Sequence, residues 1–187
     1  MALLMSNQTS FLVERNIIQR MTESARAATP DAVVGIPTLG LTYARPVAEA
    51  IGHADFVALG HSRKFWYDEN LSEQVVSSTS PDQSKRVYLD PALLERVHGR
   101  RVVVIDDVLN TGSTMAAALR LLQKARAKVA AIVVVLTEGW DWHAKLAGID
   151  PAMPGLVRAL GHIPLFGRTD KGWMPLAETE ADARPTP

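Results

Sequence analysis

The sequence predicts an α/β fold in which a parallel sheet is flanked by helices on both faces. Short β-branched apolar runs alternate with segments of helical apolar spacing along most of the chain, a pattern typical of successive strand–helix–strand units. The run at 129–136 is apolar at every position, as expected of a strand that is buried on both sides. A length of 187 residues with 47% hydrophobic residues is enough for one domain with a single core.

The expected elements follow from this alternation. Apolar residues at helical spacing predict a first helix over 11–28, which ends before Pro30. A second helix at 41–51 contains Pro46, which is costly unless it lies in the first turn or at a kink. The remaining expected elements are strands at 32–36, 54–60, 85–90, 102–105 and 129–136, and helices at 91–99 and 113–127.

The single domain is expected to span 1–177, with its core at about 30–137. Within the core, residues 62–84 form the longest polar interval and show no clear periodicity. A loop of this length in a compact domain is commonly functional or mobile. The region 138–177 contains tryptophan, proline and glycine and is expected to form a small subdomain over one end of the sheet. The polar end, 178–187, is expected to be a disordered tail.

The overall charge argues against some classes of partner. Lys and Arg (20) balance Asp and Glu (20), so no global positive field attracts nucleic acid or an anionic membrane, and we expect neither partner. The longest apolar run, 129–136, is far shorter than the ~18 residues that suggest a membrane span. The chain has no cysteine, which excludes disulfides and thiolate chemistry. The opening residues do not match a secretory signal, and we expect a cytoplasmic protein.

One stretch, VVVIDDVLNTGST at 102–114, carries the strongest functional signal. Asp106 and Asp107 follow a buried strand, and ligands of open α/β sheets bind beyond the carboxyl ends of the strands. Residues 111–114 lie where the next helix begins, so that unpaired backbone N–H groups and side-chain hydroxyls can bind a phosphate. Gly112 would let the backbone approach this anion and adopt a positive φ. Since carboxylates repel phosphate, the two acids are expected to bind sugar hydroxyls or Mg²⁺ instead.

A purely structural interpretation of this stretch is a helix capped by Thr111 or Ser113, with two solvated aspartates in the preceding loop. Capping explains the hydroxyls, but it does not explain paired acids, a glycine and several hydroxyls in one short loop. A Walker A loop is excluded because no Gly-Lys-Ser/Thr is present, and a dinucleotide site is excluded because no GxGxxG follows a strand. The stretch therefore predicts a site for a phosphorylated sugar.

The same stretch resembles the phosphoribosyl pyrophosphate (PRPP) motif of type I phosphoribosyltransferases, with four hydrophobic residues, two acids, a short spacer and Thr-Gly-x-Thr. The segment VVGIPTLGLTYARPVAEAIG at 33–52 looks like the strand, pyrophosphate loop and helix of the adenine and xanthine branch. SRK at 62–64, the polar interval after it and VYLDPALL at 87–94 are similar to that branch's basic turn, flexible catalytic loop and lead into the motif strand. The resemblance covers about 30–137. It implies the type I phosphoribosyltransferase fold with a small variable hood, formed by the N-terminal segment, by 138–177 or by both.

The resemblance also implies roles for particular residues. Asp106 and Asp107 would meet the ribose hydroxyls and would bind Mg²⁺, directly or through water. Arg63 and Lys64 would contact the pyrophosphate and complete the catalytic set. The hydroxyl turn would hold the 5-phosphate, and the pyrophosphate loop in this family often contains a non-proline cis peptide. The implied PRPP-binding residues are Asp106, Asp107, Val108, Leu109, Asn110, Thr111, Gly112, Ser113, Thr114, Pro37, Thr38, Leu39 and Gly40.

The implied reaction transfers ribose 5-phosphate from PRPP to a ring nitrogen of a nucleobase, with Mg²⁺ as cofactor, and releases pyrophosphate. We expect a purine base, a role in nucleotide salvage, and a homodimer, which is usual in the family. The pyrophosphate loop lacks the arginine common in adenine enzymes, and the segment after Phe65 lacks their glycine-rich and Glu-Tyr pattern. Asn110 stands where hypoxanthine-guanine enzymes carry an acid, so it cannot serve as an ionised base. The alternative function is a PRPP-sensing regulator with little or no turnover.

Several residues of the polar interval have two interpretations. Arg63 and Lys64 match a solvated surface pair as well as a catalytic one, although their place before the long loop favours catalysis. Trp66 and Tyr67 either close over the ligand or pack locally. Lys85 either reaches the pyrophosphate or protects a strand edge.

The tryptophans and histidines are also open to interpretation. Trp140 and Trp142 either stack on a planar base or pack in the core or in an interface. The histidines have no metal-ligand spacing and are expected to be structural or to face solvent. They are His53, His61, His98, His143 and His162.

Overall fold

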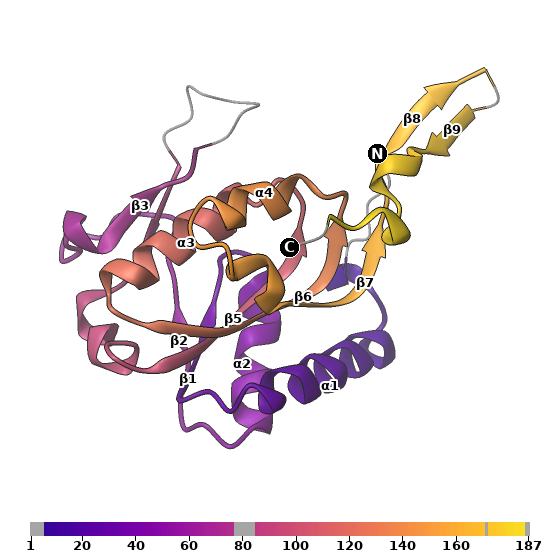
Figure 1. Ribbon diagram of the computed structural model, residues 1–187. Helices are drawn as coiled ribbons and strands as arrows, with labels where there is room; N and C mark the ends of the chain where they lie inside the picture. Colours follow the sequence, from indigo (N-terminus) through magenta and orange to yellow (C-terminus); the bar gives the residue numbers. More distant parts are fainter. Residues whose placement is uncertain (1–5, 77–84, 171, 186–187) are drawn as a thin grey trace.

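A computed structural model of the chain describes residues 6–76, 85–170 and 172–185. Its centre is a five-stranded sheet in the order β2-β1-β5-β6-β7 (Figure 1), and every pair of neighbouring strands is parallel. The predicted parallel sheet is therefore confirmed. Its strands are β1 (Ala32–Gly35), β2 (Val57–Ala58), β5 (Arg101–Leu109), β6 (Lys128–Glu138) and β7 (Val157–Ile163).

Helices cover both faces of the sheet, as Figure 1 shows. Two helices, α1 (Phe11–Ala27) and α2 (Gly40–Ala50), lie on one face, and α3 (Ser113–Lys124) and α4 (Asp141–Ala147) lie on the other. The side chains of β5 alternate between two cores: Val103 and Ile105 belong to the core under α1 and α2, whereas their neighbours on the strand belong to the core under α3. Burial on both faces explains why the central strands are continuously apolar.

Some elements differ from their predicted form. β5 continues past Ile105 to Leu109, because the residues after Ile105 still pair with β6. β7 is the fifth strand of the main sheet, so the region after 138 contributes to the core as well as to a hood. Pro46 lies inside α2, beyond its first turn. The segment 91–99 forms a 3-10 helix, η3 (Pro91–Arg96), in place of an α-helix.

The polar interval 62–84 is partly regular. It contains the short 3-10 helix η2 (Glu69–Leu71) and the strand β3 (Ser72–Gln74). β3 pairs antiparallel with β4 (Arg86–Tyr88), so the expected strand at 85–90 is confirmed. The last eight residues of the predicted loop, 77–84, lie outside the described residues.

The C-terminal region leaves the end of β7 as a hairpin of β8 (Phe166–Thr169) and β9 (Gly172–Pro175), which projects from the body of the molecule (Figure 1). The chain then returns over the sheet as η5 (Ala177–Thr179) and η6 (Ala181–Ala183). Thr179 Oγ1 accepts a hydrogen bond from Leu165 N (2.9 Å), and Glu180 O accepts one from Trp140 Nε1 (2.9 Å). These contacts hold Thr179 and Glu180 to the body of the molecule, and disorder of the tail stays a prediction. The two remaining 3-10 helices are η1 (Ser6–Gln8) and η4 (Met153–Leu156).

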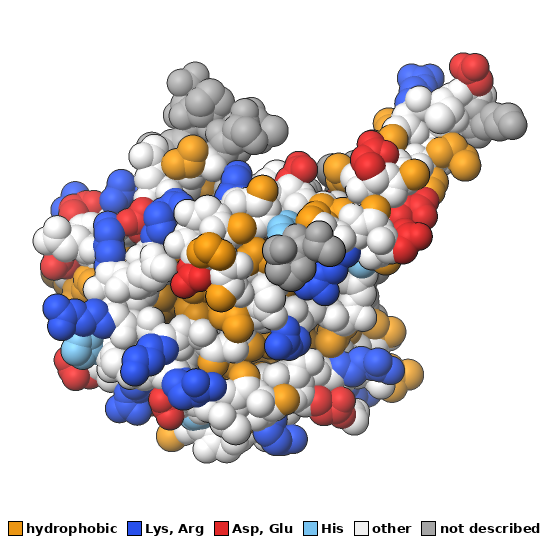
Figure 2. All heavy atoms as spheres, in the orientation of Figure 1, with side chains coloured by type: hydrophobic (Ala, Val, Ile, Leu, Met, Phe, Trp, Pro, Cys, Tyr) orange, Lys and Arg blue, Asp and Glu red, His pale blue; other side chains and the backbone are white. Residues whose placement is uncertain are grey.

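Charges of both signs are interspersed over the face seen in Figure 2, in agreement with the balanced composition. Among the helices of the described ranges, none has the length and apolar character needed to cross a membrane.

Candidate active site

The carboxyl end of β5 opens into a cavity of about 230 Å³. Two loops line it: the β1–α2 loop and the β5–α3 loop, which meet because β1 and β5 are neighbours in the sheet. Nearly all residues predicted to bind PRPP are thus brought together. The lining residues are Pro37, Thr38, Leu39, Asp106, Asp107, Val108, Leu109, Asn110, Thr111, Gly112, Ser113, Thr114 and Met115.

The two predicted acids lie at this cavity in different environments. Asp106 is only 9% exposed, whereas Asp107 is half-buried. Asp106 Oδ1 accepts a hydrogen bond from the backbone N–H of Asp107 (2.9 Å). Burial, and secondarily the negative charge of Asp107, raises the pKa of Asp106 well above its usual value. The pair therefore favours a ligand that brings hydrogen-bond donors or a cation.

The β1–α2 loop forms the facing wall of the cavity. The Pro37–Thr38 peptide bond is cis, as the family resemblance implies. Gly40 does not line the cavity but packs behind it: a Cβ at this position would lie 2.8 Å from Ile105 O and 2.9 Å from Asp106 Cα. Glycine is therefore required at the start of α2, because the helix approaches the backbone of β5 this closely.

The turn before α3 presents donors to the cavity. Gly112 is the N-cap of α3 with φ 74°, and no side chain caps this helix. The predicted positive φ is therefore confirmed. Thr111 Oγ1 donates a hydrogen bond to Ser113 Oγ (3.2 Å) and receives a long one from Ser113 N (3.4 Å). The backbone N–H groups that open α3 point towards the cavity end of the helix, where an anion is stabilised.

α4 packs directly against this turn, which the sequence did not predict. A Cβ on Gly112 would lie 3.0 Å from Trp142 Cα and 3.2 Å from Leu146 Cδ1. Lys145 lies on the same face of α4, and its Nζ donates a hydrogen bond to Ser113 Oγ (2.7 Å). The sequence offered one signal for this contact, namely the spacing of positions 142, 145 and 146, which places them on one side of a helix.

Glu138, at the end of β6, is a second residue that the sequence did not single out. It is 6% exposed, and its Oε2 accepts a hydrogen bond from Asn110 Nδ2 (2.7 Å). β6 lies beside β5 in the sheet, so this buried carboxylate orients the amide of a cavity residue.

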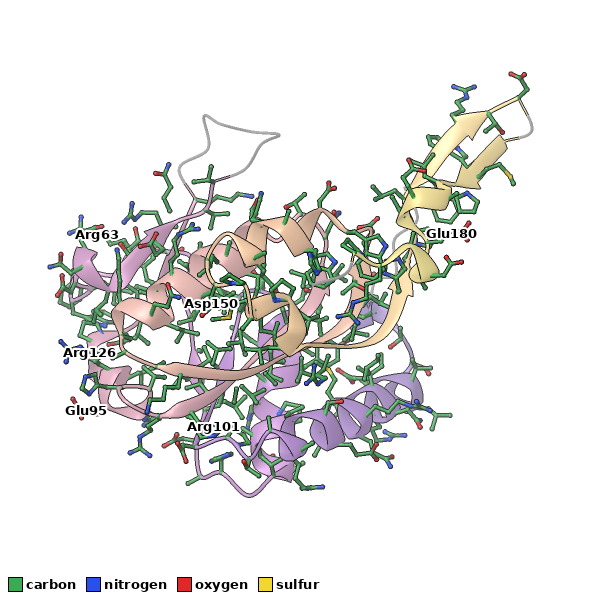
Figure 3. All side chains as sticks on the ribbon, in the orientation of Figure 1. Arg63, Glu95, Arg101, Arg126, Asp150 and Glu180 are labelled. Carbon is green, nitrogen blue, oxygen red and sulfur yellow. The ribbon has the colours of Figure 1, made fainter. Side chains whose placement is uncertain are left out.

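Arg63 and Lys64 do not line the cavity. Arg63 Nε forms an ion pair with Glu69 Oε1 (2.8 Å), and Figure 3 places Arg63 at the outer edge of the molecule, opposite Glu180 in this view. Downstream of Arg63, Glu73 in β3 pairs with Arg120 (3.3 Å) and with Lys124 (2.6 Å) of α3.

These ion pairs explain the position of Arg63. Burial tends to raise the pKa of Glu73, but the hydrogen bonds and charges of Lys124 and Arg120 outweigh burial and lower it. Both cations lie in the half of α3 farther from the cavity. The segment that carries Arg63 is thus anchored away from the acids, and the structure does not bring the four predicted catalytic residues together.

Four aromatic residues singled out in the sequence, together with His162, lie outside the lining of the cavity. Trp142 is 1% exposed, and its Nε1 donates a hydrogen bond to Gly139 O (3.0 Å). Of the two interpretations of Trp142, packing in the core is therefore the one observed. The rings of Trp140 and His162 stack with their centroids 4.4 Å apart. His162 also forms hydrogen bonds with Thr137 Oγ1 and Thr179 O. The expected structural role is therefore observed for His162. Trp66 and Tyr67 pack locally, since Trp66 Nε1 donates to Asp90 Oδ2 (3.0 Å) and Tyr67 packs on Tyr88.

The chain belongs to the phosphoribosyltransferase family: a family model described as "Phosphoribosyl transferase domain" matches residues 3–150. Relatives that it matches include adenine phosphoribosyltransferases, which confirms the resemblance to that branch. The chain is 29% identical over 126 residues to that of Rhodospirillum centenum (64% of this chain, 66% of the relative). It is 32% identical over 137 residues to that of Thermosynechococcus vestitus (72% and 75%). The chain thus spans slightly less than two thirds of the length of the first of these relatives.

Solved structures support the same fold. The adenine phosphoribosyltransferase of Thermoanaerobacter pseudethanolicus superposes with a TM-score of 0.66 at 18% identity, covering 81% of each chain. The enzyme of Trypanosoma brucei, solved in complex with AMP, pyrophosphate and ribose-5-phosphate, gives a TM-score of 0.65 at 17% identity, covering 86% of this chain and 68% of the other. The predicted fold class, a parallel sheet with flanking helices and a hood, is therefore confirmed.

Proposed function

We propose that the protein transfers ribose 5-phosphate from PRPP to a purine base and releases pyrophosphate, in nucleotide salvage. The observation that carries this proposal is the single cavity that combines a carboxylate pair, a helix start rich in donors and the β1–α2 loop. Adenine is the first candidate base, because the relatives are named for it. No finding favours the regulatory alternative.

The acids and the turn bind different parts of the substrate. Asp106 and Asp107 accept hydrogen bonds from the ribose hydroxyls, and the N–H and hydroxyl groups at 111–114 bind the 5-phosphate. When pyrophosphate leaves, positive charge develops on the sugar. A carboxylate ~5 Å from that charge, at an effective dielectric of ~20, stabilises it by about 3 kcal/mol, equivalent to roughly two powers of ten in rate.

The acid pair also fits Mg²⁺. Asp106 and Asp107 are adjacent carboxylates with hard oxygen ligands, and the described part of the chain has no cluster of three or more acidic, histidine or cysteine ligands. Mg²⁺ commonly binds through one or two carboxylates plus waters and substrate phosphates. When bound, Mg²⁺ would neutralise charge on the pyrophosphate. Asp106 and Asp107 would hold the ion directly or through water.

Neutralisation of the leaving group by Arg63 and Lys64 stays a prediction. Arg63 is held by Glu69 in an exposed ion pair, and exposed pairs of this kind contribute about 0–1 kcal/mol. The low energy of this pair allows Arg63 to exchange Glu69 for a pyrophosphate oxygen, provided that the segment carrying Arg63 moves towards the cavity. The cytoplasmic location also stays a prediction.

We further propose a homodimer in which the β8–β9 hairpin packs on the start of α1 of a second copy. The hairpin carries Trp173 (62% exposed) and Met174 (49%), and none of its described residues belongs to the two cores. A two-stranded hairpin is marginally stable alone. Phe11 and Leu12 of α1 form another uncovered apolar patch (76% and 64%), and a two-fold arrangement would bury both patches in each copy.

The dimer is tested by light scattering during size-exclusion chromatography. Trp173→Ser should shift the wild-type dimer to monomer, whereas Phe65→Ser, which removes an exposed aromatic elsewhere, should not. A wild-type monomer, or a Trp173→Ser dimer, would contradict this interface.

The transfer activity is tested with a panel of nucleobases incubated with PRPP and Mg²⁺, with pyrophosphate release as the readout. We expect release with a purine, first of all adenine, and none without a base. PRPP binding without release for any base would support the regulator instead.

A further inference from the structure

We propose that Lys145, on α4 and outside the PRPP motif, binds the terminal phosphate and makes the site select substrates by the charge of that group. The proposal rests on the proposed function, because it concerns the same cavity. Lys145 is 31 positions past the end of the motif at Thr114, and it reaches the turn only because α4 packs there.

The hydroxyl groups of Ser113 and Thr111 share one hydrogen bond and leave one proton over. A serine or threonine hydroxyl has two acceptor lone pairs and one donor hydrogen. Ser113 Oγ accepts a hydrogen bond from Lys145 Nζ (2.7 Å) and lies 3.2 Å from Thr111 Oγ1, so that one of the two hydroxyls donates to the other. Whichever of them donates, the proton of the other has no acceptor within the described ranges, and both residues line the cavity. The group that binds at this point must therefore accept a hydrogen bond.

The charge of Lys145 points to the same kind of ligand. Its side chain forms no ion pair with any carboxylate of the described residues, unlike Lys124 on α3. An ammonium group has three donors, and one is used by Ser113. Two donors and the positive charge remain. Lys145 does not itself line the cavity, but its Nζ contacts Ser113, which does, beside a helix start that itself favours anions. A phosphate dianion uses all of these groups, whereas the free hydroxyl of an unphosphorylated sugar uses at most one.

The position of Lys145 is fixed by packing. Trp142 and Leu146 are buried, on the same face of α4, and they pack so closely on Gly112 that a Cβ there would lie only 3.0 Å from Trp142 Cα. α4 thus cannot move away without exposing these side chains. The cation is held ready before the ligand binds, which reduces the entropic cost of binding.

The test compares Lys145→Gln, which removes the charge, with Lys145→Arg, which keeps it. Lys128→Gln is the matched control, because it removes the same charge at the opposite, amino-terminal end of β6. Calorimetry measures the affinity for ribose 5-phosphate, with ribose as the uncharged comparator, and melting temperatures report on the fold. Steady-state assays measure KM for PRPP and kcat.

Lys145→Gln should weaken binding of ribose 5-phosphate about 10- to 100-fold and raise KM for PRPP, with kcat changed little, because this contact exists before and during reaction. Lys145→Arg should restore most of the affinity, and Lys128→Gln should match wild type. Equal affinity of wild type and Lys145→Gln would overturn the proposal, as would an equal loss in the Arg variant. Failure of the proposed function is distinguishable: ribose 5-phosphate would still bind in a Lys145-dependent manner, but no base would release pyrophosphate.

Discussion

Asn110 Nδ2 donates a hydrogen bond to Glu138 Oε2 across 2.7 Å, at the point where β5 and β6 end side by side. A carboxylate only accepts hydrogen bonds, so this contact fixes which end of the Asn110 amide faces Glu138. The oxygen of the amide remains to accept a hydrogen bond at the cavity. A substrate group that binds this oxygen must carry an N–H or O–H donor.

Asn110→Asp should destabilise the fold at neutral pH. It replaces the donor with a second carboxylate beside the buried Glu138, and an unsatisfied buried group costs about 1–3 kcal/mol. The melting temperature of the Asp variant should fall by several degrees relative to wild type.

The control for this change is Asn110→Ala, which also removes the donor but adds no charge. Its melting temperature should fall less than that of the Asp variant. Identical melting temperatures for the Asp and Ala variants would show that a carboxylate at position 110 does not interact with Glu138.

Gly112→Ala should lower both stability and phosphate affinity. The positive φ alone costs an L-residue about 1–2 kcal/mol, and the added methyl group would lie 3.1 Å from Trp142 Cβ, which pushes α4 and Lys145 away from the turn. Gly99 offers a matched control, because its φ of 72° is nearly the same and nothing lies within 4 Å of an added Cβ. Differential scanning calorimetry should show a larger loss for Gly112→Ala than for Gly99→Ala, and only the former should weaken binding of ribose 5-phosphate.

Asp106→Asn should stabilise the protein in the absence of divalent cations. Burial, together with the charge of Asp107, raises the pKa of Asp106 in the folded chain, so the folded state binds this proton more tightly than the unfolded state. Stability is therefore lost as pH rises from the unfolded pKa, about 3.9, through the folded pKa, and it stays lower above that window. The Asp106→Asn variant has no carboxylate at this position, so it does not lose this stability as pH rises.

In EDTA, the melting temperature of Asp106→Asn should exceed that of wild type by a few degrees at pH 7.5. The difference between the two proteins should vanish below about pH 4. A variant that melts below wild type at both pH values would mean that Asp106 stabilises the fold and is not held there for function.

The main features of the site were predictable because they are contiguous in sequence. The acids, the glycine and the hydroxyls lie within 102–114, and a strand that runs into a helix start places them at one edge of the sheet. The facing loop at 37–40 was predictable only from the family resemblance, because nothing in its composition marks it as a wall of the same cavity.

Contacts between distant segments were not predictable. Lys145 meets Ser113 only through the packing of α4, and Arg63 lies away from the cavity because Glu73 is anchored to α3. β7 was missed because it is an edge strand whose sequence, VRALGHI, mixes charged and small residues with apolar ones. These features depend on tertiary contacts that local spacing does not encode.

The most direct test of the whole proposal is turnover by Asp107→Asn, measured as pyrophosphate release with PRPP, Mg²⁺ and the preferred base. The amide keeps the shape of the half-buried side chain but removes its charge, so the melting temperature should stay close to wild type while kcat falls at least 100-fold. Turnover within a few-fold of wild type by a correctly folded Asp107→Asn variant would contradict the assignment of this cavity as the site of phosphoribosyl transfer.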